Sequence, residues 1–134
     1  MAKLRHFAIV VRDLERAARF YEQVFDLKRV GRDDLAIGSG VYLSDGVVNL
    51  ALLQYKSAAA AGVDSLDDLV GAHHFGFKVE NLEATQRRIE AAGGRFFFDL
   101  GKTRDDVNFE RKFKDPEGII FDISEKGWLG NERD

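Results

Sequence analysis

An internal repeat is the feature that most constrains how this 134-residue chain can fold. Residues 6–15 read His-Phe-Ala-Ile-Val-Val-Arg-Asp-Leu-Glu, and residues 74–83 read His-Phe-Gly-Phe-Lys-Val-Glu-Asn-Leu-Glu. The two segments align without a gap, and they lie about half the chain apart. Self-similarity at a long, fixed spacing indicates two structurally equivalent modules.

Each repeated segment has the pattern of a β-strand followed by a helix. Residues 4–11 and 74–79 alternate between two faces, and we expect the bulkier face, which includes Phe7, to pack on the helices. Asp13 and Asn81 are good N-cap residues, because their side-chain oxygens accept hydrogen bonds from free backbone N–H groups. Apolar residues then recur at helical spacing: Leu14, Ala17, Ala18, Tyr21 and Phe25 in the first module, and Leu82, Thr85, Ile89 and Ala92 in the second.

Three further strands are predicted after each helix. They cover residues 27–32, 35–43 and 46–54 in the first module and 94–99, 107–114 and 118–124 in the second. Gly38 and Gly40 are interpreted as turn residues, and Asp115-Pro116-Glu117-Gly118 is a strong turn signal. Each module therefore has the order β-α-β-β-β.

We expect an α+β fold in which two βαβββ modules form a curved mixed sheet around a cleft. The chain is predicted to be a single domain, with module one at about 1–54 and module two at about 72–124. Residues 55–71 form the connector, in which 64–69 are predicted as a short helix, and residues 125–134 form a C-terminal tail.

Composition excludes several classes of function. The net charge is -3, so neither nucleic acid nor a membrane surface is an expected partner. The absence of cysteine removes disulfides, thiolate metal sites and cysteine nucleophiles. The start of the chain has no signal-peptide or transit-peptide pattern, and no apolar run is long enough to span a membrane. We expect a cytoplasmic protein that acts on a small molecule.

Two of the three histidines occupy equivalent positions in the repeat, at His6 and His74. If a pseudo-twofold axis relates the modules, their imidazoles can approach one another near it and bind a divalent metal ion. Asp122 lies in the apolar run of residues 119–123, where a carboxylate is costly to bury without a partner. We therefore predict a metal site formed by His6, His74 and Asp122, whereas His73 is interpreted as structural or exposed.

The repeat also pairs Asn49 of the first module with Asp122 of the second. Asn49 is the polar residue within an apolar run, so it could coordinate the metal, orient a water, contact substrate or only form a structural hydrogen bond. We take Asn49 and Asp122 as the candidate catalytic residues. Nearby, Arg111, Lys112 and Lys114 are interpreted as a solvated basic face, one member of which could hold an anionic group.

At these residues the sequence resembles the vicinal-oxygen-chelate superfamily, which includes glyoxalase I, methylmalonyl-CoA epimerase, extradiol dioxygenases and bleomycin-binding proteins. The resemblance is carried by Leu4–Phe25, Val47–Leu53, Ala72–Gly94 and Asp115–Ile123. It implies a glyoxalase-like fold, with ligand positions at His6, Asn49, His74 and Asp122. It further implies a divalent ion (Fe, Ni, Co, Zn or Mn) to which two adjacent oxygens of a substrate bind.

The chain departs from the family pattern at two of these positions. Asp122 stands where glutamate is usual, and Asn49 stands where glyoxalase I has glutamate, so glyoxalase I activity is disfavoured. The resemblance implies that an extradiol dioxygenase would need an additional histidine as an acid–base group. His73 is the only candidate left, and strand alternation turns it away from the face of His74, which weakens a dioxygenase assignment.

The leading hypothesis is a metal-dependent enzyme with lyase, isomerase or dioxygenase chemistry on a small oxygenated substrate. The alternative is a metal-free, bleomycin-resistance-like protein that sequesters a small molecule, and a third possibility is an inactive relative. A homodimer is expected, because the edges and apolar surface of a half-open sheet need cover. Trp128 is expected either to pack the tail onto the body or to close a site.

Overall fold

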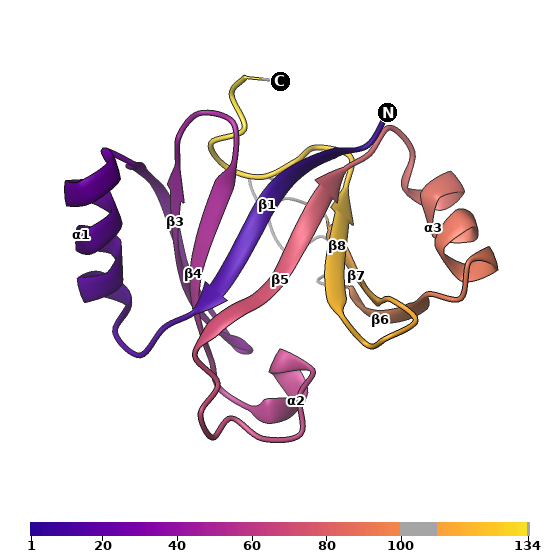
Figure 1. Ribbon diagram of the computed structural model, residues 1–134, viewed down its shortest axis with the longest axis horizontal. Helices are drawn as coiled ribbons and strands as arrows, with labels where there is room; N and C mark the ends of the chain where they lie inside the picture. Colours follow the sequence, from indigo (N-terminus) through magenta and orange to yellow (C-terminus); the bar gives the residue numbers. More distant parts are fainter. Residues whose placement is uncertain (100–109, 134) are drawn as a thin grey trace. The chain divides into compact units, whose positions relative to one another are not determined.

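The computed structural model describes residues 1–99 and 110–133, and eight strands and three helices lie within these ranges. In chain order they are β1 (Lys3–Val10), α1 (Leu14–Phe25), β2 (Lys28–Leu35), β3 (Gly38–Ser44), β4 (Asn49–Tyr55), α2 (Ala58–Ala61), β5 (Gly71–Lys78), α3 (Leu82–Ala91), β6 (Arg95–Asp99), β7 (Glu110–Lys114) and β8 (Ile120–Ser124) (Figure 1). The predicted β-α-β-β-β order is present twice, and α2 lies between the two runs. The α+β class with a mixed eight-stranded sheet is thus confirmed.

The described residues group into two compact units. Unit 1 combines Met1–His6 with His74–Trp128, and unit 2 combines Phe7–His73 with Leu129–Asp134. Strands β1 and β5 therefore contribute residues to both units, whereas the sequence repeat places the module boundaries in the connector. The single-domain organisation stays a prediction, and each unit is described by itself below.

In unit 2, strands β2, β3 and β4 pair antiparallel, and the end of β1 follows β4 in the sheet order. Helix α1 packs on these strands (Figure 1). Their shared core consists of Leu14, Ala18, Val41, Leu43 and Leu52. Asp13 caps α1 as predicted, because its carboxylate accepts the Arg16 N–H at 3.0 Å.

Several predictions in unit 2 were wrong. Gly38 and Gly40 lie within β3 instead of at turns, and a Cβ at Gly38 would collide with the backbone of Gln54 on β4, so close strand pairing requires glycine there. Phe25 is 61% exposed and Phe7 is 41% exposed, although both were assigned to helix-packing faces. Residues 64–69 contain a turn and not a helix.

Helix α2 instead covers the alanine run, where Ser57 caps its first turn by accepting the Ala60 N–H. Gly62 closes the helix in the left-handed region, with φ of 73°. Alanine has the highest helix propensity, so the run and its two caps explain the position of this short helix.

In unit 1, the strand order continues from the beginning of β1 through β5, β8, β7 and β6. Strand β5 pairs parallel with β8, and the β8–β7 and β7–β6 pairs are antiparallel. Helix α3 lies beside β6 (Figure 1), and Asn81 caps it by accepting the Ala84 N–H at 2.8 Å. The core of the unit consists of Val79, Leu82, Phe113 and Ile123. Residues 107–109 of the predicted seventh strand lie outside the described residues.

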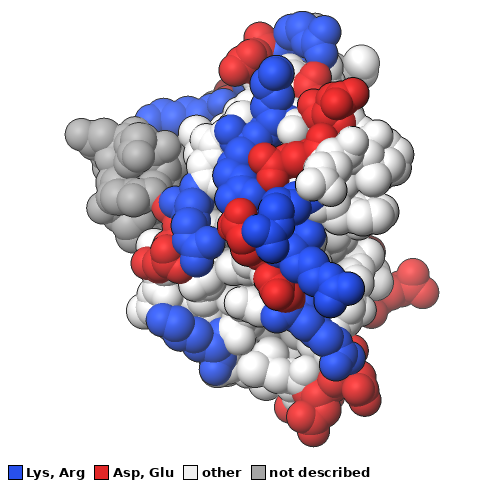
Figure 2. Space-filling model, turned by 90° about the vertical axis from the view of Figure 1, so that its left-hand side faces the viewer, with Lys and Arg blue, Asp and Glu red and all other residues white. Residues whose placement is uncertain are grey.

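The face shown in Figure 2 carries basic and acidic side chains that are interleaved and not segregated by sign. Between β2 and α1, Arg29 pairs with Glu15 at 2.9 Å and with Glu22 at 2.8 Å. Within residues 1–99 and 110–133, no helix has the length and apolarity needed to cross a bilayer.

Candidate metal centre

The three predicted ligands converge within unit 1. His6 comes from β1, His74 from β5 and Asp122 from β8, and at most 4% of each residue is exposed. The two imidazole Nε2 atoms lie 3.2 Å apart. Asp122 Oδ2 lies 3.2 Å from the Nε2 atom of His74 and 3.6 Å from that of His6. The repeat and strand alternation therefore predicted a cluster that the fold brings together.

Sheet register explains this convergence. The parallel β5–β8 pairing sets Gly76 opposite Asp122, two residues beyond His74 on the same face of β5. A Cβ at Gly76 would lie 2.7 Å from the Trp128 ring and 3.0 Å from His6 Cβ. Glycine thus lets the indole approach the sheet, where it stacks on the His6 imidazole with 4.7 Å between ring centroids. Trp128 therefore covers one side of the cluster.

The prediction for Lys112 was wrong: we expected it on a solvated face, but the residue is only 7% exposed. The β7–β8 register sets it directly opposite Asp122. Its ammonium group donates to both Asp122 oxygens at 2.9 Å, and its Nζ lies 3.4 Å from His74 Nε2. Arg111 points to the other side of β7, where it pairs with Glu83 at 2.6 Å.

Glu110 is a second member of the cluster that the sequence did not reveal. It lies on the same face of β7 as Lys112, and one of its carboxylate oxygens is 3.5 Å from Lys112 Nζ. Its other oxygen accepts the Trp128 indole N–H at 2.6 Å. The tight Asp115–Gly118 turn was the available signal for both residues, because it fixes the hairpin register that sets Lys112 opposite Asp122.

Burial and mutual charge determine the ionisation of the cluster. Burial lowers the pKa of His6 to about 4, although Asp122 acts in the opposite direction, so this imidazole is neutral near pH 7. Burial opposes ionisation of Asp122, but His74 and Lys112 outweigh it and hold the carboxyl pKa below its usual range. Burial raises the pKa of Glu110, and Lys112 partly offsets that rise.

The donor set fits a divalent ion. Two imidazoles and one carboxylate form the 2-His-1-carboxylate set that first-row metals use in proteins. Ligand atoms about 2.1 Å from a common ion stand roughly 3 Å apart at right angles, which agrees with the observed 3.2 Å and 3.6 Å separations. His6, His74 and Asp122 can therefore hold such an ion without a large rearrangement of the strands.

Asn49 lies in unit 2, where it is buried on β4 and its amide donates to the Leu129 carbonyl at 2.9 Å. This hydrogen bond holds the Asn49 amide against the C-terminal tail, and a part for Asn49 in the site stays a prediction. The Nε2 atom of His73 lies 2.7 Å from the Ala61 carbonyl oxygen, also within unit 2, which agrees with its structural interpretation.

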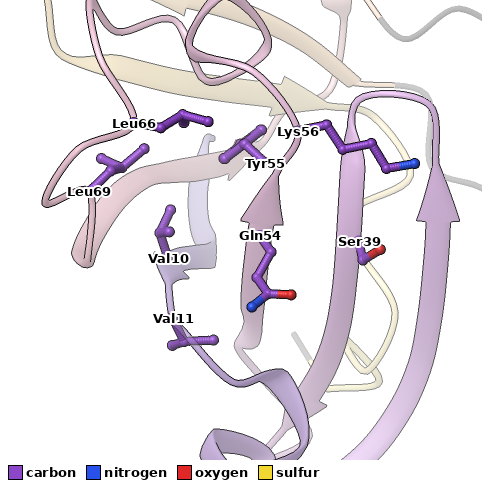
Figure 3. Close-up of a pocket in the computed structure, with 8 residues that line it drawn as sticks. All are labelled: Val10, Val11, Ser39, Gln54, Tyr55, Lys56, Leu66 and Leu69. Carbon is purple, nitrogen blue, oxygen red and sulfur yellow. The ribbon is translucent and has the colours of Figure 1, made fainter.

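Unit 2 also contains a pocket of about 380 Å³, shown in Figure 3. Its lining combines four apolar side chains with four that carry polar groups, and the residues are Val10, Val11, Ser39, Gln54, Tyr55, Lys56, Leu66 and Leu69. Gln54 is held by donation to the Arg12 carbonyl. A pocket of this size and lining has room for a small molecule with both polar and apolar parts.

The fold and the buried cluster define a class of glyoxalase-like proteins with a candidate 2-His-1-carboxylate site. The chain belongs to the Glyoxalase/Bleomycin resistance protein/Dioxygenase superfamily, whose family profile matches residues 3–123. The resemblance noted from the sequence is thereby confirmed.

Among curated relatives, a lactoylglutathione lyase of Arabidopsis thaliana is 27% identical over 91% of this chain and 44% of its own length. A probable chloroplastic lactoylglutathione lyase of the same plant is 26% identical over 93% of this chain and 36% of its own. The chain thus spans less than half the length of these relatives.

Solved structures show the same fold. A methylmalonyl-CoA epimerase of Streptomyces coelicolor superposes with a TM-score of 0.73 at 17% identity, covering 91% of this chain and 95% of the epimerase. The epimerase of Mycobacterium tuberculosis also gives 0.73 at 17% identity, covering 90% and 85% of the two chains.

Proposed function

We propose that this protein is a metal-dependent enzyme of the lyase or isomerase kind that acts on a small oxygenated substrate. The observation that best supports this proposal is that His6, His74 and Asp122 are buried with their side chains close together. We propose these three residues as the metal ligands. A bound divalent ion would act as a Lewis acid that stabilises negative charge on a substrate oxygen. The names of the relatives, lactoylglutathione lyase and methylmalonyl-CoA epimerase, support carbonyl compounds with acidic C–H bonds as the substrate class.

The surrounding residues have separable tasks in this proposal. Burial of the cluster excludes water, and the stacked Trp128 fixes the orientation of the His6 ring. Glu110 is the proposed acid–base group, because its carboxylate, with Lys112 as its ammonium partner, lies beside the proposed metal ligands, where it would hold a substrate proton. This assignment moves the acid–base role to β7, since Asn49 cannot accept a proton and Asp122 serves as a ligand.

The proposed reaction is tested by exchange of substrate C–H protons with deuterated water, followed by NMR. Lactoylglutathione and methylmalonyl-CoA are the first compounds to examine, each with apo protein and with protein loaded with Ni, Co, Zn, Mn or Fe(II). We expect metal-dependent exchange that falls at least about 100-fold in His74→Ala and in Asp122→Asn. His73→Ala is the matched control, because this neighbouring histidine contacts Ala61 and lies outside the cluster. Exchange that is equal in wild type and His74→Ala contradicts the proposal.

A metal-free small-molecule-binding protein is the second candidate, and the pocket of Figure 3 is the observation that favours it. In that case, an apolar fluorescent ligand should bind stoichiometrically in the presence of a chelator, and His74→Ala should bind it equally well. Fe(II)-dependent oxygen consumption would instead favour a dioxygenase. Glyoxalase I activity stays disfavoured as a prediction, and the lactoylglutathione assay measures it directly.

The homodimer and the cytoplasmic location also stay predictions. Light scattering of the purified protein determines the oligomeric state, with a mass of twice 15.1 kDa expected.

A further inference from the structure

We propose that Lys112 is a tethered competitor of the metal ion: its ammonium group holds the Asp122 carboxylate and must leave it before a divalent ion binds. The inference rests on the proposed metal site and adds to it a residue that limits metal affinity.

The geometry places the ammonium group among the ligands themselves. Lys112 Nζ lies 2.9 Å from Asp122 Oδ1 and 2.9 Å from Oδ2, so it engages both oxygens of the carboxylate. It also lies 3.4 Å from His74 Nε2. A lysine ammonium therefore contacts two of the three residues that a metal ion would need.

Charge makes the two cations alternatives to each other. Asp122 is fully buried, and a buried carboxylate requires a counter-charge, which Lys112 now provides. A divalent ion on the same carboxylate would supply that charge instead. If the ammonium stayed in place, it would repel the ion across a few ångströms of low-dielectric interior. Binding of the ion thus requires Lys112 to withdraw.

Glu110 offers the displaced ammonium a second carboxylate. It lies two residues earlier on the same face of β7, with Oε1 only 3.5 Å from Lys112 Nζ. Trp128 holds the other oxygen of this carboxylate through the 2.6 Å indole hydrogen bond. The flexible stem of lysine permits a short movement from Asp122 toward Glu110 without a change in the backbone.

Metal affinity measured by calorimetry with Zn or Ni tests the competition. Lys112→Gln removes the charge and keeps a hydrogen-bond donor for Asp122, and we expect it to bind metal roughly tenfold or more tightly than wild type. Lys112→Arg keeps the charge and should not gain affinity. Lys114→Gln removes a charge from the same face of the same strand, beside Phe97, and is expected to match wild type.

Glu110→Gln tests the second half of the proposal. In the wild-type background it should weaken metal binding, because the displaced ammonium loses its alternative carboxylate. In the Lys112→Gln background, the same substitution should have little effect. This double-mutant cycle distinguishes a movement of the Lys112 ammonium from Asp122 to Glu110 from a general loss of charge in the site.

The outcomes distinguish the inference from the proposed function. If wild type binds metal and Lys112→Gln binds it equally or more weakly, the competition is overturned and the metal site stands. If wild type and Lys112→Gln both fail to bind metal, the metal site and the competition are both overturned. If Lys112→Gln does not fold, ¹⁵N NMR of the Lys112 ammonium in wild type decides: its signal should shift on metal addition, and an unchanged signal overturns the proposal.

Discussion

Asp122 is the residue around which the candidate site is organised. It is fully buried, contacts both histidines and forms a two-oxygen ion pair with Lys112. Its place was predictable from the sequence, because a lone carboxylate in an apolar strand requires a partner and the repeat supplies two histidines. Lys112 and Glu110 were not predictable in the same way, since a charged strand of alternating sign is usually solvated. Only the register against β8 turns their face inward.

The pH dependence of stability tests the environment assigned to His6. Its pKa is lowered to about 4 in the folded state, against 6.5 in the unfolded chain, chiefly by burial. Above pH 6.5 the imidazole is neutral in both states, so the titration of His6 does not lower the free energy of unfolding there. Between pH 6.5 and 4, His6 is protonated in the unfolded chain but not in the folded state, so the free energy of unfolding falls. We expect the metal-free protein to lose up to about 3 kcal/mol in this window.

Urea denaturation of the apo protein at several pH values between 7 and 4 measures this loss. His6→Gln is the control, because glutamine does not titrate and its profile should be flatter over that interval. Identical slopes for wild type and His6→Gln would show that His6 is not held neutral by the fold.

At the scale of elements, local sequence rules predicted the strands and the helix caps. The same rules did not predict every turn position or every buried face. Asp13 and Asn81 cap the two repeated helices, as their position before each apolar stripe predicted. The glycines of β3 misled the prediction, because a glycine needed for close strand pairing has the same sequence signature as one needed for a turn. Phe25 completes a helical stripe in the sequence, but it is largely exposed and does not belong to the core that packs against α1.

The packing of Trp128 against β1 and β5 depends on Gly76. A Cβ there would meet the indole at 2.7 Å, so Gly76→Ala should displace the ring and cost about 1–3 kcal/mol of stability. Trp128 is the chain's single tryptophan, and its fluorescence therefore reports this movement directly. We expect a shifted emission spectrum and a lower denaturation midpoint.

Ala72→Val is the matched control for that experiment, because it adds bulk at an exposed position of the same strand. It should leave the emission unchanged. An unchanged spectrum in Gly76→Ala would instead show that the indole does not rest on this part of β5.

At the scale of the whole chain, the repeat predicted the fold class, and the family match confirms it. The reaction does not follow from the fold, because a protein named as a lyase and one named as an epimerase are both similar to this chain. A set of buried charges lies beside the three candidate ligands of this chain. Lys112 and Glu110 come from a strand whose inward face no composition or spacing argument identified.

The metal content of the protein tests the central claim most directly. Protein expressed without a chelating tag is loaded with Ni, Co, Zn, Mn or Fe(II) in turn, dialysed and analysed by mass spectrometry for bound metal per chain. We predict close to one ion per chain for at least one metal in wild type and in His73→Ala, and almost none in His74→Ala or Asp122→Asn. No bound ion in wild type with any of the five metals, or equal binding by His74→Ala, would contradict the account.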